Sequence, residues 1–202
     1  MRFIKSIVAV FALFTAANSF AQEKFDIDVT HSNVTFTVRH MVVAKVSGEF
    51  KKYSGTIIYD AKDITKSSVN VMIKVASIDT ENEGRDNHLR SGDFFNAATD
   101  SLITFVSKKI KKKGKGYIAT GDFTLRGVTK EIELPFTIFG TIKDQGGDTR
   151  LGIEAKTTIN RFDYGVKWAR ALEGGNLVVS KDVDIILNIE AKAPKTLEAQ
   201  KK

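Results

Sequence analysis

The chain has 202 residues, a net charge of +7, 42% hydrophobic residues and no cysteine. This length suits one domain, and the lack of cysteine excludes disulfides, a cysteine nucleophile and a lipid-modified N-terminal cysteine. The basic excess is mild and is not gathered into a stripe, so nucleic acid is not an expected partner.

The first 21 residues have the pattern of a secretory signal peptide. Arg2 and Lys5 give the segment a positive start, and an apolar run follows over Ile7–Phe14. Small residues precede a cleavage site after Ala21. The apolar run is too short to span a bilayer as a helix, which disfavours the alternative of a membrane anchor. We therefore expect a periplasmic or secreted protein.

Apolar and polar residues alternate along most of the remaining chain. Because successive side chains of a strand point to opposite faces, such a stretch has one apolar face and one wet face. Val69, Val71 and Ile73, for example, alternate with polar or flexible residues. The pattern predicts strands over residues 34–38, 53–60, 69–75, 102–110, 117–125, 132–138, 151–159 and 183–189.

Turn-forming segments at 113–116, 126–129 and 144–148 separate several of these strands and favour antiparallel neighbours. Roughly eight one-sided strands bury their apolar faces best by closing into a barrel or by stacking as a sandwich. Pro135 lies on the polar face of a predicted strand, which indicates a bulge or an unpaired position there.

Two segments, 80–100 and 160–175, break the strand pattern. The first contains a polar cluster formed by Arg85, Asp86, His88, Arg90 and Asp93. We predict that these side chains satisfy one another around a helical turn as a structural brace, with Phe94 and Phe95 closing one end of the barrel. The alternative is recognition of a polar head group by Arg85, His88 or Arg90.

Common catalytic motifs are absent from the sequence: it has no G-x-S-x-G turn and no H-E-x-x-H helix. Its histidines, His31, His40 and His88, lack the spacing of metal ligands, so a hydrogen-bonded role is favoured over a metal site. A lipid-modifying hydrolase or isomerase with His88 or His40 as general base is the remaining enzymatic alternative.

The densest charge lies at Lys108–Lys115, with the sequence KKIKKKGK. A solvated hairpin tip is the favoured interpretation of this run. The functional alternative is contact with an anionic membrane surface or with a pyrophosphate head group.

Four segments resemble one known family. The most recognisable is RDNHLRSGDFF at residues 85–95, and DVTHSNVTF at 28–36 is followed by His40. The hairpin GDFTLRGVTK covers 121–130, and NRFDYGVKW covers 160–168. Together they resemble the YceI-like family of lipid (polyisoprenoid)-binding proteins, with a tyrosine where the last motif usually has phenylalanine.

The resemblance implies an all-β fold, an extended antiparallel eight-stranded barrel similar to lipocalins and capped by short helical segments. It also implies that the lumen binds, and carries or stores, a polyprenyl phosphate, an isoprenoid quinone or a similar amphiphile. No enzymatic activity, cofactor or metal is implied, and members of the family are sometimes linked to stress responses. A barrel filled by its own side chains, with a structural or stress role, stays open as an alternative because small barrels do both.

We therefore predict a signal peptide at 1–21, a YceI-like lipid-binding barrel at 22–191 and a flexible tail at 192–202. The expected partner is an isoprenoid or other long-chain lipid, with room for transient membrane contact and for a homodimer. The residues expected to line the apolar lumen and bind the ligand are Phe36, Val38, Val71, Ile73, Phe105, Phe123, Leu134, Phe136, Ile153 and Trp168.

Overall fold

A computed structural model of the chain describes residues 22–173 and 175–193. The predicted signal peptide at 1–21 and residues 194–202 of the predicted tail lie outside the described residues. Among the described residues, no helix is both long enough and apolar enough to cross a membrane.

The regular secondary structure of the described chain is mainly β-strand, with one α-helix, α1 (Glu83–Arg90). Its strands are β1 (Glu23–Ile27), β2 (Asn33–His40), β3 (Ala44–Phe50), β4 (Tyr53–Tyr59), β5 (Ser68–Lys74), β6 (Ile78–Asp79), β7 (Leu102–Lys113), β8 (Gly116–Leu125), β9 (Val128–Lys143), β10 (Thr149–Asn160) and β11 (Asp182–Ala193). A 3-10 turn, η4 (Arg161–Tyr164), follows β10.

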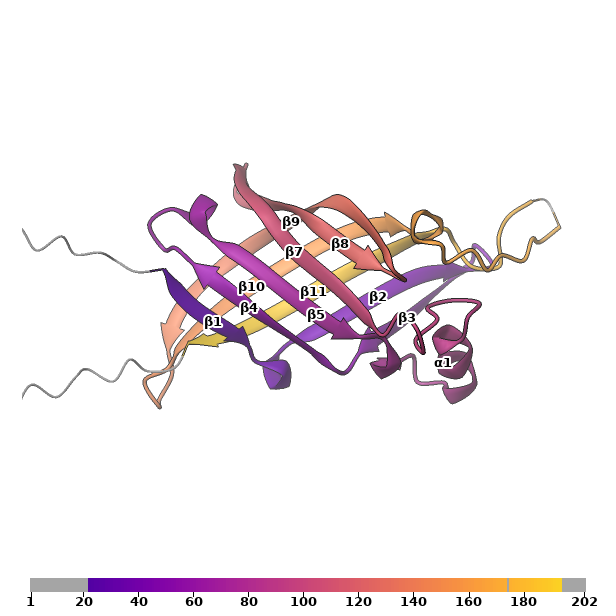
Figure 1. Cartoon of the computed structure of the whole chain (residues 1–202), viewed down its shortest axis with the longest axis horizontal. Helices are drawn as coiled ribbons and strands as arrows, with labels where there is room; N and C mark the ends of the chain where they lie inside the picture. The colour runs from indigo at the N-terminus through magenta and orange to yellow at the C-terminus, as the bar shows by residue number, and fades with distance from the viewer. Residues whose placement is uncertain (1–21, 174, 194–202) are drawn as a thin grey trace, which may run out of the picture.

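Eight strands close into an antiparallel barrel in the order β1-β4-β5-β7-β8-β9-β10-β11, and β11 pairs back onto β1. The closing pairs are Asp26 with Lys192 and Ile27 with Ala191. The first half of β11 pairs instead with β2, so the β2–β3 hairpin extends the wall towards the end that carries α1 (Figure 1). This architecture confirms the predicted fold class.

The structure also adds strands that the alternation did not predict, namely β1, β3 and the short β6. The last strand is longer than expected: Lys192 and Ala193 belong to β11, and Ala193 is buried. The predicted boundary between barrel and tail therefore falls two residues too early. The irregularity expected at Pro135 is found on one side only: Pro135 pairs with Ile118 of β8, whereas the β9–β10 ladder ends at the adjacent pair of Phe136 and Ala155.

The end of the barrel near the first and last described residues is sealed by a separate packed cluster. Phe25, Leu151 and Ala191 are fully buried there, and Ile57 and Ala193 complete the cluster. The Phe25 ring packs edge-on against Tyr59 with 5.9 Å between centroids. The opposite end carries α1 and the loop after η4 (Figure 1). The two ends are therefore built differently: strand residues pack together at one, and α1 and loops with buried residues such as Phe94 and Val166 cover the other.

An arginine on β10 ties three acidic side chains together. Arg150 donates to Asp28 at 2.6 Å, to Glu190 at 2.9 Å and to Asp144 at 2.9 Å. Asp28 also contacts the ring of His31 at 2.9 Å. These hydrogen bonds favour the ionised carboxylate and lower the pKa of Asp28 from 3.8 to about 2, with His31 the largest cause.

Because the pKa of Asp28 is lower in the folded state, its stabilising effect is present above about pH 4 and is lost as the pH falls towards 2. We expect Asp28→Asn to lower the free energy of unfolding at pH 7 by about 1–2 kcal/mol, discounted for partial solvent screening. Urea unfolding of both proteins at pH 7 and pH 2 measures the difference. An equal difference at both pH values would contradict this account.

Candidate ligand-binding site

An apolar cavity of about 430 Å³ runs inside the barrel. Pockets that bind small molecules in proteins commonly have volumes of this order. The structure places every lumen residue predicted from the sequence on the wall of this cavity: Phe36, Val38, Val71, Ile73, Phe105, Phe123, Leu134, Phe136, Ile153 and Trp168. Their contact with a ligand stays a prediction.

Many wall residues are only partly buried although they point into the barrel. Leu134, Phe136 and Ile153 belong to this group, as do Ile185 and Leu187 of β11. Residues on the inner face of a filled barrel would be fully buried, as Phe25, Leu151 and Ala191 of the sealed end are. The exposed area of these side chains therefore faces unfilled space in the lumen.

A group of stacked rings lies at the α1 end of the cavity. Phe94 stacks on Trp168 with 5.3 Å between centroids, and the ring of His88 meets both edge-on at 5.0 and 5.7 Å. Phe95 packs against Phe50 at 6.2 Å. Phe94 and Phe95 thus lie at this end of the barrel, as predicted, and both form part of the cavity wall. We call this end the mouth.

The prediction that Arg85 and Asp86 are satisfied by other members of the cluster is wrong, because both side chains bind Thr80 instead. Asp86 is buried and accepts from the Thr80 amide at 3.0 Å and from its hydroxyl at 2.5 Å. Arg85 donates through Nε to the Thr80 hydroxyl and through a second nitrogen to the Thr80 carbonyl, both at 2.7 Å. The partner that joins them lies outside the charged cluster, so the charges alone did not reveal it.

The rest of the polar cluster divides into two parts. Arg90 donates to the Ile78 carbonyl at 3.1 Å and to the Asn87 side chain at 2.9 Å, which supports a bracing role. His88 contacts Asp93 at 2.9 Å on the surface. Among the cluster residues, Arg85 and His88 are the ones that line the cavity, at its mouth. The cluster is therefore partly a brace and partly a polar rim.

Two arginines that the analysis of the sequence did not single out hold the mouth together. Arg161 of η4 is buried and donates to the backbone carbonyls of Val166, Trp168, Val179 and Ser180. Burial lowers the pKa of this guanidinium below its ordinary value. Arg126 donates to the carbonyls of Gly92 and Gly165. The motif NRFDYGVKW contained Arg161, but its four carbonyl partners are set only by the fold.

The described residues include one group with the composition of a metal site, formed by Asp28, His31 and Glu190. Arg150 donates to both carboxylates and so already supplies the positive charge that a cation would bring. This arrangement favours a structural ion-pair network. His40 and His88 lie on the cavity wall, away from this group. His40 has no side-chain hydrogen bond in the described part of the chain, which differs from the expected hydrogen-bonded histidine.

The contacts of Asp86 predict that its removal destabilises the fold through Thr80. Asp86→Ala leaves the Thr80 amide and hydroxyl without their acceptor, and we expect a loss of about 2–4 kcal/mol in the free energy of unfolding. Asp86→Asn keeps an acceptor oxygen and should lose less. Asp93→Ala, at an exposed ion pair, should cost under about 1 kcal/mol. Chemical denaturation of the three variants tests this order, and an equal loss for Asp86→Ala and Asp93→Ala would contradict it.

Comparison with known proteins agrees with the geometry. A family model described as the YceI-like domain matches residues 25–191. Protein YceI of Escherichia coli O17:K52:H18 (strain UMN026 / ExPEC) is 36% identical over 179 residues, which cover 88% of this chain and 91% of that relative.

Solved structures share the fold. The crystal structure of the Campylobacter jejuni YceI protein is 32% identical, has a TM-score of 0.68 and covers 78% of this chain and 90% of its own. A polyisoprenoid binding domain from Saccharophagus degradans, implicated in plant cell wall breakdown, has a TM-score of 0.60 at 18% identity and covers 86% of this chain and 99% of its own. The family match runs from Phe25 in β1 to Ala191 in β11 and so spans the whole barrel. The chain belongs to the YceI-like family.

Proposed function

We propose that this protein binds a long-chain isoprenoid or similar amphiphile in the barrel lumen and carries or stores it in the periplasm. The observation that carries the proposal is the apolar cavity of about 430 Å³, whose own wall side chains remain partly exposed to it. Burying a hydrocarbon chain gains about 0.8 kcal/mol per CH₂ before entropic costs. An apolar lumen of this kind therefore favours an apolar occupant.

The mouth suits the polar end of such a ligand. Arg85 uses two of its guanidinium nitrogens on Thr80, and its third has no partner in the described part of the chain. His88 adds a second polar group at the same rim. A phosphate or a quinone oxygen at this position would accept from them while the chain extends into the lumen. The polyisoprenoid-binding domain of the same fold supports an isoprenoid chain.

A binding role also fits the surroundings of the histidines better than catalysis does. His88 contacts Asp93 and the rings of Phe94 and Trp168. The hydroxyl of Thr80, which also lines the cavity, donates to Asp86 instead of to a histidine. A hydrolytic reaction would need a nucleophile aligned with the base. Activity of the purified protein against lipid esters or phosphates would favour the enzymatic alternative.

The single tryptophan of the chain, Trp168, lies at the mouth and reports on ligand entry. We expect the fluorescence of delipidated protein to change saturably on titration with a polyprenyl phosphate or an isoprenoid quinone. The double variant Val71→Phe and Leu134→Phe fills part of the lumen and should weaken binding at least about tenfold. Val106→Phe, a matched change on the exposed outer wall, should leave it unchanged. Equal binding by both variants, or no binding by the wild type, would refute the proposal.

Because side chains do not fill the lumen, we expect different losses of stability when two phenylalanines are truncated to alanine. Phe25 is fully buried in the sealed end, so Phe25→Ala should cost about 3–5 kcal/mol. Phe136 faces the cavity, is only partly buried, and stacks on Tyr117 with 5.6 Å between ring centroids. Phe136→Ala in delipidated protein should therefore cost under about 2 kcal/mol. Chemical denaturation compares them, and a cost for Phe136→Ala as large as that for Phe25→Ala would indicate a filled barrel.

A further inference from the structure

The loop joining β2 to β3 exposes three consecutive apolar residues. Met41, Val42 and Val43 are 45%, 51% and 85% exposed. The loop is tight, since His40 still pairs with Ala44 on its two sides. Hairpin tips are normally built from Gly, Asn or Asp, so an apolar tip of this kind calls for a physical reason. We refer to Met41–Val43 as the apolar tip.

The backbone of the apolar tip has a conformation that its residues disfavour. Met41 has φ 48° and Val42 has φ 67°, both in the left-handed region. A β-branched side chain such as that of Val42 is rarely found there, and glycine would avoid the strain. Keeping valine at this position costs stability without adding packing, because the side chain is exposed. Strain of this kind is a mark of functional positions.

The apolar tip lies beside the mouth of the cavity. The Met41 amide donates to the Val178 carbonyl at 2.8 Å, and His40 bridges to Val179. His40, Val178 and Val179 all belong to the cavity wall. In Figure 1 the far end of the β2–β3 hairpin lies at the same end of the barrel as α1 and the loop after η4, away from the start of β1 and the end of β11. Whatever contacts the tip is therefore close to the entrance of the lumen.

Positive charge surrounds the apolar tip. The segments 39–45 and 167–182 that form this end contain Glu173 and Asp182 as their acidic residues. In the described part of the chain, the basic side chains of these segments have no ion-pair partner. They are Arg39, Lys45, Lys167, Arg170 and Lys181. Exposed apolar groups with unpaired cations around them match the chemistry of an anionic bilayer surface, where each cation adds to the attraction.

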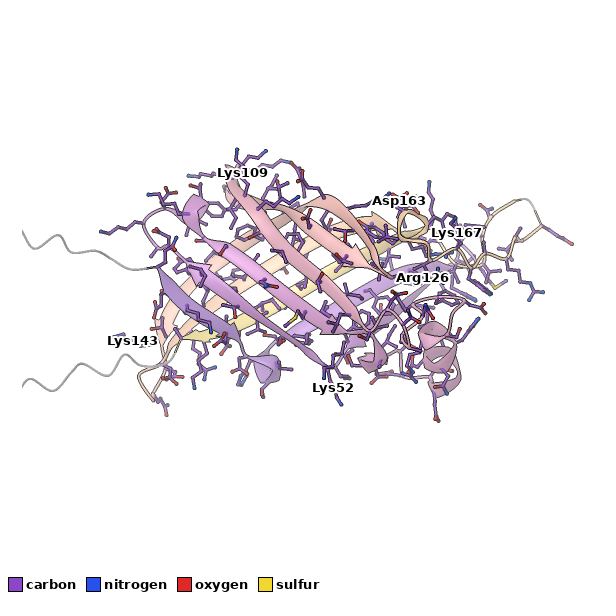
Figure 2. The ribbon with its side chains drawn as sticks, in the orientation of Figure 1. Lys52, Lys109, Arg126, Lys143, Asp163 and Lys167 are labelled. Atoms are coloured by element: carbon purple, nitrogen blue, oxygen red, sulfur yellow. The ribbon has the colours of Figure 1, made fainter. Side chains whose placement is uncertain are left out.

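The lysine-rich hairpin at Lys108–Lys115, for which the sequence left membrane contact open as an alternative, differs from the apolar tip in its exposed side chains. Its Lys108 is paired with Asp122 and Glu131, and the apolar side chain within the run, Ile110, is buried. Figure 2 shows Lys109 on this hairpin at the top of the barrel and Lys167 near the mouth end, well apart. The hairpin therefore offers charge without an exposed apolar group to insert.

We propose that the apolar tip docks the mouth of the barrel onto a bilayer containing anionic lipid. Met41, Val42 and Val43 enter the boundary between head groups and acyl chains, and the surrounding cations contact the anionic head groups. A long-chain ligand then passes between bilayer and lumen without crossing water. This passage rests on the proposed function, whereas the docking itself does not require an occupied lumen.

The test is co-sedimentation of the delipidated mature chain with two kinds of vesicle. One is phosphatidylcholine alone, and in the other about 30% of the lipid is phosphatidylglycerol. We expect binding to the anionic vesicles and weakening in 1 M salt, since salt screens surface charge. The double variant Val42→Asp and Val43→Asp should bind at least about tenfold more weakly. Ile142→Asp, an equally exposed apolar site on β9 at the sealed end, should bind as the wild type does.

Val42→Gly separates docking from a structural role of the tip. Glycine relieves the positive φ, so the melting temperature should stay or rise while vesicle binding falls about threefold or more. A variant that loses vesicle binding yet retains the Trp168 response to ligand in solution supports docking as a distinct property. The proposal is overturned if the wild type does not bind anionic vesicles, or if the tip and Ile142→Asp variants bind equally. A failed Trp168 titration with intact vesicle binding would reject the lumen ligand alone.

Discussion

Closure of eight strands sets how much space lies inside this protein, and the side chains on the inner faces do not fill it. An eight-stranded barrel has an interior that is either just filled by side chains or holds one small ligand. Here side chains fill the sealed end, where Phe25 and Leu151 are fully buried. Around the middle and the mouth, inner-face residues such as Leu134 and Ile185 stay partly exposed to the lumen. The proposed binding of a ligand in the lumen depends on this unfilled space.

The mouth requires support that a sealed end does not. Phe94, Tyr164 and Val166 are buried there, but they lie in loops and in η4, outside the paired strands. Arg161 gathers carbonyls of the segment after η4, and Arg126 joins Gly92 to Gly165. Asp86 holds Thr80 at the start of the segment that carries α1. Hydrogen bonds from side chains to backbone thus hold the rim in place while the centre of the mouth stays lined by rings.

Many of the strands and of the cavity-wall residues could be predicted from the sequence. An alternation of apolar and polar residues with a period of two shows which side chains share one face of a strand. That rule placed Phe36, Val71 and Ile153 on one wall without any knowledge of strand order. It missed β3 because Lys45, Ser47 and Glu49 alternate there with Val46 and Gly48, so the strand has little apolar content. It also failed for Arg85 and Asp86, since their common partner Thr80 is neutral and lies before the helix. Partners fixed by tertiary structure leave no mark on local patterns.

The central claim is that the lumen holds a lipid in the native protein, and native mass spectrometry of the protein purified without detergent tests it most directly. We predict a species heavier than the polypeptide by the mass of a long-chain lipid, which organic solvent releases and which can then be identified as a prenyl phosphate, a quinone or a related amphiphile. Finding only the bare polypeptide, with no uptake of added prenyl phosphate or quinone, would contradict the account.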